Sequence, residues 1–214
     1  MITDKINSAL IDLHQLYNDE FKLILAYVES YKLAFPGPVL NEIRAINDHV
    51  FRSIDPQSSE EIALIEIKKA KGHLTRAILD CFKLLLIAYE KDVRGFEDSY
   101  KDVNLALVKD GDFLHEMRNL KNIARKKAVE AKTKESKSFP EKEESYLAYK
   151  DAINAYEDIF AYIESSSKAL VNAKAVAKKV TKKQKFASVG YAFIGAVFGV
   201  ILTIICECIK KYFN

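Results

Sequence analysis

Apolar side chains recur every three or four residues along most of the chain, which is the spacing of one face of an α-helix. The first such stripe lies within residues 3–34 and consists of Ile6, Leu10, Leu13, Tyr17, Phe21, Ile24 and Val28. The Pro- and Gly-containing stretch 35–38 ends it, because these residues punctuate a helical pattern. We therefore expect a long first helix over 3–34 and a second one over 39–53.

A third helix is predicted to start at Ser58, because Ser58 and Glu61 have the spacing of a capping box. It is expected to run to about Asp92. Gly95 and the stretch 110–112 then bracket a shorter fourth helix.

A basic helix is predicted over 113–136, and a last helix over Pro140 and beyond, where Ser138 and Pro140 suit its start. Nothing between Glu141 and Phe186 breaks this last helix, so it is predicted to form a stalk or collar.

An uncharged run of 21 residues follows at 186–206. A helix of about 20 apolar residues is long enough to cross the hydrocarbon layer, so this run is predicted to be a transmembrane helix. The positive charge before it exceeds that after it, which predicts a single-pass membrane protein with its N-terminal body in the cytoplasm. The membrane-flanking lysines are Lys178, Lys179, Lys182, Lys183 and Lys185.

One face of this predicted span carries small and polar residues at intervals of three or four: Ser188, Ala192, Gly195, Gly199, Thr203 and Glu207. Gly195 and Gly199 form a GxxxG pair, which lets helix backbones approach closely. The stripe therefore predicts a helix that packs against copies of itself. In a ring of copies, Thr203 and Glu207 would line a central pore.

The composition supports an all-α fold, because the 214 residues include only 7 Gly and 4 Pro, too few for the turns of a strand-rich protein. We expect a cytoplasmic helical bundle whose long C-terminal helix leads into a single transmembrane helix. The predicted segments are a bundle at 1–137, a stalk at 138–185, the span at 186–209 and a short tail at 210–214.

The net charge of +3 is unevenly distributed. Residues 118–137 carry +6 and residues 168–185 carry +7, which leaves −10 on the rest of the chain. The first basic stretch is a candidate contact for RNA or for anionic lipid, because both are rich in phosphate, and the alternative is a solvated helix face. The candidate residues are Arg118, Lys121, Arg125, Lys126 and Lys127.

Several classes of chemistry lack their signatures. The sequence has no P-loop, GxGxxG, HExxH or CxxC motif, and its histidines show no metal-ligand spacing, so no metal and no cofactor are expected. The odd number of cysteines, 3, argues against a disulfide-stapled secreted domain.

Arg44 and His49 are the candidate catalytic residues, with Asn47 and Asp48 between them. An imidazole can move protons to and from ribose and leaving oxygens, and a guanidinium can brace phosphate oxygens. The alternative is that both side chains make structural hydrogen bonds.

The spacing from Arg44 to His49 resembles the R-x4-6-H signature of HEPN domains, although Ala45 stands where that family favours a polar residue. Together with the predicted span, it looks like the small membrane accessory proteins of type VI-B CRISPR systems. The resemblance implies a helical bundle, antiviral defence at the membrane and an RNA-guided effector as partner. In HEPN nucleases, two copies of the motif form one metal-independent site.

The expected function is a membrane-anchored, self-assembling and pore-forming accessory protein that perturbs the membrane in antiviral defence, without enzymatic activity. A membrane-tethered HEPN-type ribonuclease is the alternative, and an inactive tail-anchored scaffold is the second alternative. The expected partners are membrane lipids, further copies of the chain, and RNA or an RNA-guided effector.

Overall fold

The computed structural model describes residues 3–32, 34–137 and 143–180, and every regular element within them is a helix. The elements are α1 (Asp4–Leu16), the π-helical segment η1 (Tyr17–Phe21), α2 (Lys22–Lys32), α3 (Gly37–Ser53), α4 (Glu60–Ser99), the 3-10 segment η2 (Leu105–Gly111), α5 (Asp112–Lys137) and α6 (Glu143–Ser165). A further helix occupies residues 167–180. The all-α class is confirmed for these residues.

The predicted first helix is present, with one irregularity that the apolar spacing explains. The buried residues Ile6 and Leu13 are seven positions apart, Leu13 and Phe21 are eight apart, and Phe21 and Val28 are again seven apart. Seven residues are close to two helical turns, so a spacing of seven keeps the stripe on one face. The spacing of eight contains one extra residue, which the helix has to accommodate in a wider turn if the stripe is to stay on that face. The π-segment η1 absorbs it, because the N–H of Lys22 donates to the carbonyl of Tyr17.

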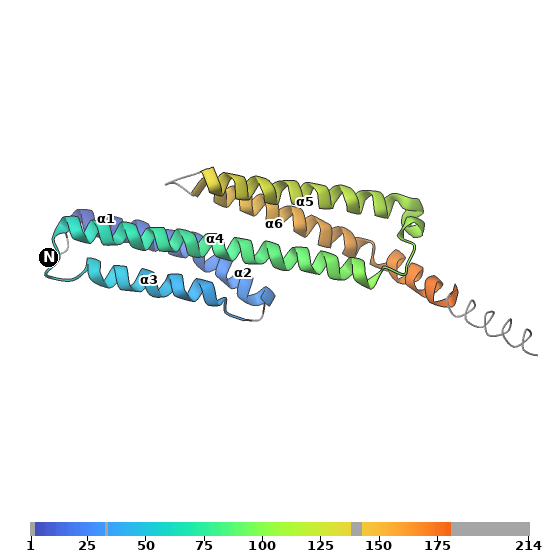
Figure 1. The fold of residues 1–214 in the computed structure, drawn as a ribbon, viewed down its shortest axis with the longest axis horizontal. Helices are drawn as coiled ribbons and strands as arrows, with labels where there is room; N and C mark the ends of the chain where they lie inside the picture. The colour runs from blue at the N-terminus through green and yellow to red at the C-terminus, as the bar shows by residue number, and fades with distance from the viewer. Residues whose placement is uncertain (1–2, 33, 138–142, 181–214) are drawn as a thin grey trace, which may run out of the picture. The chain divides into compact units, whose positions relative to one another are not determined.

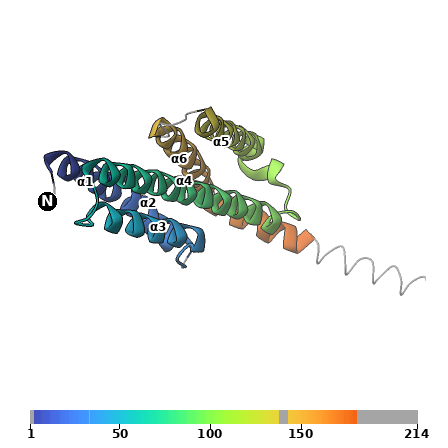
Figure 2. The ribbon, with the colours of Figure 1, turned by 60° about the vertical axis from the view of Figure 1, so that its left-hand side comes forward.

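Helix α4 is the centre of the bundle and contacts every other helix of it (Figures 1 and 2). It packs antiparallel to α3 and to α5, as ion pairs along its length show. Aromatic contacts join it to α2 through Tyr31 and Tyr89, and to α6 through Phe82 and Tyr149, whose rings stack 5.6 Å apart. This position explains the wide apolar stripe of α4, where Leu74, Ile78 and Leu85 are fully buried.

The boundaries of α4 differ from those predicted. Its N-terminal cap is Ser59, whose hydroxyl accepts a hydrogen bond from the N–H of Ile62, while the hydroxyl of Ser58 donates to the carbonyl of Arg52. At the other end α4 continues through Gly95 to Ser99. Gly95 does not end it because an isolated glycine costs a helix only about 1 kcal/mol. The predicted fourth helix is wrong, since η2 occupies its place.

The chain forms two compact units. The first contains residues 1–98 and 116–164, which include α1 to α4, most of α5 and most of α6. The second contains residues 99–115 and 165–214, of which the structure describes 99–115 and 165–180.

The second unit contains a turn of left-handed backbone. Lys109, Asp110 and Gly111 all have positive φ, of 51°, 55° and 97°. The predicted turn at 110–112 is thus present, and it places the ammonium of Lys109 2.8 Å from the hydroxyl of Ser166, to which it donates.

The predicted long stalk is wrong. Helix α6 ends at Ser165, a turn follows at Ser166, and α6 is a bundle helix whose Tyr149, Ala152 and Ile159 are fully buried.

The membrane part of the predicted fold class is corrected as well. Among residues 3–32, 34–137 and 143–180, none of the helices combines the length and the apolar content needed to cross a bilayer, because charged side chains interrupt each of them. The predicted span at 186–209 and its tail at 210–214 lie outside the described residues. The same is true of Lys182, Lys183 and Lys185 and of the whole small-residue stripe, Ser188, Ala192, Gly195, Gly199, Thr203 and Glu207.

Candidate functional site

A polar layer joins α3 to α4 through two crossed Glu–His pairs. Nδ1 of His49 on α3 lies 2.7 Å from Glu66 on α4, and Nδ1 of His73 on α4 lies 2.8 Å from Glu42 on α3. Each helix thus contributes one Glu and, seven positions later, one His, and the antiparallel packing crosses the pairs. The two imidazole rings stack with their centroids 5.1 Å apart.

Cations border both carboxylates of this layer. The ammonium of Lys69 is 2.6 Å from Glu66, and Nε of Arg76 is 3.2 Å from Glu42. The pKa of Glu66 is lowered to about 2, chiefly by its hydrogen bond with Lys69 and next by that with His49. The carboxylate therefore stays ionised at any pH near neutral.

The proton on His73 decides which partner it has. Its Nδ1 also lies 2.7 Å from Nη2 of Arg76, and one nitrogen cannot serve both neighbours. A protonated Nδ1 donates to Glu42, whereas a bare Nδ1 accepts from Arg76. The hydrogen bond that His73 forms therefore depends on whether its Nδ1 carries a proton, whereas His49 has Glu66 as its hydrogen-bond partner.

The predicted partners Arg44 and His49 are not brought together within one chain. Five positions along a helix correspond to about 140° of rotation, so the two side chains leave α3 on different faces. His49 is half-buried against α4, with 15% of its side chain exposed, while Arg44 is exposed. The residues that do surround His49 are Glu66 and His73, which the sequence reasoning missed. The repeated spacing Glu42–His49 and Glu66–His73 is the signal that could have found them.

Three of the five predicted basic contacts on α5 already have carboxylate partners. Lys121 pairs with Glu97, Arg125 lies 3.2 Å from Glu90, and Lys127 lies 3.3 Å from Asp151. These pairs hold α5 against α4 and α6. The remaining two, Arg118 and Lys126, are exposed.

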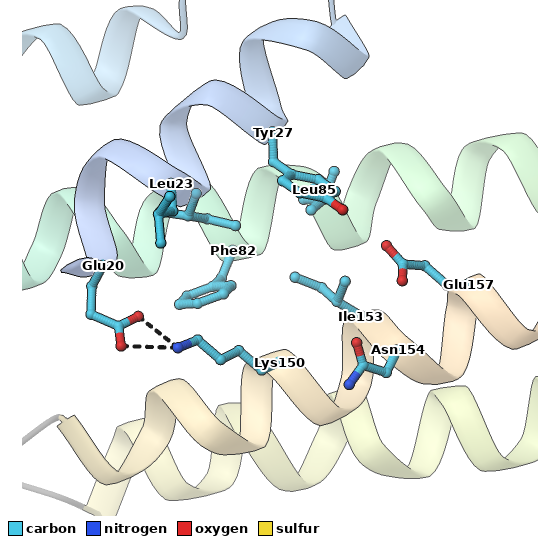
Figure 3. A pocket seen from close by; sticks show the side chains of 10 residues that line it. Glu20, Leu23, Tyr27, Phe82, Leu85, Lys150, Ile153, Asn154 and Glu157 are labelled. Carbon is cyan, nitrogen blue, oxygen red and sulfur yellow. Dashed lines mark hydrogen bonds and ion pairs between the residues drawn. The ribbon is translucent and has the colours of Figure 1, made fainter. Parts of the chain in front are cut away.

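A cavity of about 220 Å³ lies among η1, α2, α4 and α6 (Figure 3). Apolar side chains from three helices form much of its wall: Leu23, Ile24, Phe82, Leu85 and Ile153. At one end Lys150 contacts both carboxylate oxygens of Glu20, at 2.7 and 2.9 Å. The π-segment supplies Glu20, and the remaining lining residues are Tyr27, Asn154 and Glu157.

The second unit has a larger open cavity, of about 660 Å³, between residues 102–109 and helix 167–180. One face of that helix lines it with Ala169, Ala173, Val176, Ala177 and Val180. Leu107 on the opposite wall is 73% exposed, and Val176 and Val180 are 57% and 49% exposed. Lys168, Lys174, Lys178 and Lys179 are the only charged residues of helix 167–180.

Within the part of the chain that the structure describes, no group of His, Cys, Asp or Glu side chains has the geometry to hold a metal ion. The single described cysteine, Cys81, is buried, and burial raises the pKa of its thiol to about 12, which makes it a poor nucleophile at neutral pH.

No protein family, no curated protein and no solved structure matches this chain.

Proposed function

We propose that this chain is a non-enzymatic protein that acts at the surface of an anionic membrane, and that helix 167–180 is its lipid contact. The observation that carries the proposal is the combination of an open apolar face and purely positive charge on this one helix. Val176 and Val180 lie on the cavity side, and the four lysines carry no acidic neighbour within the helix. Amphipathic helices of this composition bind at the interface of anionic bilayers.

The energetics favour lipid over water as the neighbour of this face. Burying apolar area yields about 25 cal/mol per Å². Each lysine near an anionic surface adds about 1 kcal/mol. The ammonium of Lys174 lies over the ring of Tyr100, 4.6 Å from its centroid. This contact holds one of the four positive charges in a defined position on the second unit. Self-assembly, a pore and antiviral defence are the further parts of the expected function, and they rest on the sequence pattern and the family resemblance.

The test places a fluorophore on the proposed contact in the full chain. Val176→Cys, with the native cysteines replaced by serine, is labelled with an environment-sensitive dye and mixed with phosphatidylglycerol or phosphatidylcholine vesicles. We expect a blue shift with phosphatidylglycerol only, and its loss in high salt or when Lys174, Lys178 and Lys179 are changed to Glu.

A dye at Leu147→Cys, an exposed position on α6, is the matched control and should not respond. A label at 176 that stays in water with both lipids would refute the proposal.

A HEPN-type ribonuclease is the second candidate, and the stacked imidazoles of His49 and His73 favour it. Two neighbouring imidazoles can act as acid and base in metal-independent cleavage of a phosphodiester. Under this hypothesis, His49→Ala and His73→Ala each abolish cleavage of single-stranded RNA, whereas the exposed His14→Ala does not. The assay should cover about pH 5 to 8, the range in which imidazoles titrate. Purified protein that leaves RNA intact throughout this range would exclude the ribonuclease hypothesis.

A further inference from the structure

The cavity of Figure 3 has one charge that its surroundings leave uncompensated. Glu20 is neutralised, because Lys150 contacts both of its oxygens. Glu157 receives one hydrogen bond, from the hydroxyl of Tyr89 at 3.2 Å. Within residues 3–32, 34–137 and 143–180, no lysine or arginine forms an ion pair with Glu157. The lining thus carries two carboxylates and one ammonium.

One tyrosine lines the cavity together with Glu157, and two others pack next to that carboxylate outside the lining. Tyr27 lines the cavity and is exposed, and Tyr89, the partner of Glu157, packs edge-on against Tyr31 with centroids 4.8 Å apart. The hydroxyl of Tyr31 in turn donates to Asp92. Ring faces and carboxylates together attract organic cations, the rings through their quadrupole and the carboxylates through their charge.

The rest of the cavity wall is apolar and therefore favours a cation that carries an apolar group. Phe82, Leu85 and Ile153 are buried in the bundle and present only carbon atoms to the cavity. Asn154 adds one polar group next to Glu157 on the same face of α6, three positions away (Figure 3). A volume of about 220 Å³ is below the range of about 300–1,000 Å³ that is typical of drug-sized ligands, so the ligand is small.

We propose that this cavity binds a small amine with one apolar group, the protonated nitrogen resting between Glu157 and Tyr27 and the apolar group covering Phe82 and Ile153. The ion pair of Lys150 with Glu20 closes the far end, and it disfavours anions because the ammonium of Lys150 already has a carboxylate partner. The π-segment is part of the site, since it positions Glu20 for that pair. Such insertions are frequent at binding sites. The site lies in the first unit and is independent of the lipid contact proposed for helix 167–180.

The experiment titrates the full chain with 2-phenylethylamine by calorimetry, and with 2-phenylethanol as the neutral probe of the same shape. We expect the amine to bind at least about tenfold more tightly than the alcohol. Glu157→Gln should remove this preference while keeping the hydrogen bond from Tyr89. Glu164→Gln, the same change on an exposed residue of α6, should retain it. Tyr27→Leu should weaken amine binding about threefold.

A gain of charge provides a second route. Asn154→Lys places an ammonium three positions from Glu157 on an exposed site, so it should compete with the amine without disturbing the core. Equal affinity for amine and alcohol, no binding of either by the wild-type chain, or unchanged preference in both Glu157→Gln and Asn154→Lys would each overturn the proposal.

Discussion

Helix α4 and helix 167–180 both carry an apolar stripe, but among residues 3–32, 34–137 and 143–180 only the stripe of α4 has neighbours that cover it. In α4, fourteen residues are buried beneath the five other helices of the bundle. In helix 167–180, Leu170 is buried while Val171, Val176 and Val180 remain exposed within the described structure. A period of 3.6 thus predicts a helix and its apolar face, whereas the contacts of that face depend on which other helices pack against it.

The charges of the two helices differ in the same way. Around α4, acidic and basic side chains are matched, as in the pairs of Glu90 with Arg94 and Arg125. All charged residues of helix 167–180 are lysines. Matched charges hold one bundle together, whereas charge of one sign attracts an outside partner of the opposite sign. The charges around α4 are thus paired within one unit, whereas those of helix 167–180 all have the same sign.

Truncating the core of α4 should have the largest effect on stability. Leu79→Ala removes a side chain that is 1% exposed and leaves a cavity, so we expect the free energy of unfolding to fall by about 2–5 kcal/mol. Chemical denaturation followed by circular dichroism measures it. A loss below about 1 kcal/mol would mean that the bundle repacks around the site.

Glu66→Gln should destabilise the chain by a smaller amount that depends on pH. The pKa of Glu66 is about 2 in the folded protein and about 4.5 when unperturbed, so its ionised form contributes stability above pH 4.5 that is lost as the pH falls towards 2. The difference in denaturation midpoint between wild type and variant should thus be constant near neutral pH. It should shrink towards zero as the pH falls from 4.5 to 2.

Glu61→Gln, an exposed position of the same helix, serves as the control for the pH series. A Glu66→Gln difference that is independent of pH down to 2 would show that the interaction with Lys69 and His49 does not depend on charge.

A Gly→Ala substitution should raise the free energy of unfolding in the first unit and lower it in the second. Gly95→Ala lies within α4, where an added Cβ has open space, and should stabilise by about 0.5–1 kcal/mol. Gly111 has a φ of 97°, so Gly111→Ala should destabilise by about 1 kcal/mol. Hydrogen exchange of amides in each unit separates the two effects, and equal signs would contradict the backbone assignment at Gly111.

Val176→Ala should change stability least, by no more than about 0.5 kcal/mol, because more than half of this side chain is exposed. Its effect should appear instead in weaker binding to phosphatidylglycerol vesicles. A large loss of stability would show that the apolar face of helix 167–180 is covered in the folded chain and is therefore no lipid contact.

The local sequence determined the class of the fold and the place of most helices. The apolar period, the Pro- and Gly-containing stretch at 35–38 and the turn at 110–112 act over a few residues, and α3, α5 and the combined run of α1, η1 and α2 lie where they predict. The polar residues near 58–61 located the start of α4 to within two positions, because Ser58 and Ser59 are equally suited to cap a helix.

Only the tertiary structure decided which side chains meet. The distance between Arg44 and His49 in sequence suggested one site, but their angular separation on α3 sends them to different neighbours. The crossed pairs of Glu42 with His73 and of His49 with Glu66 depend on the register of two antiparallel helices, and the pair of Glu20 with Lys150 depends on a π-segment that meets α6 more than a hundred residues away. Contacts of this kind follow from how whole helices pack, which no short window of sequence contains.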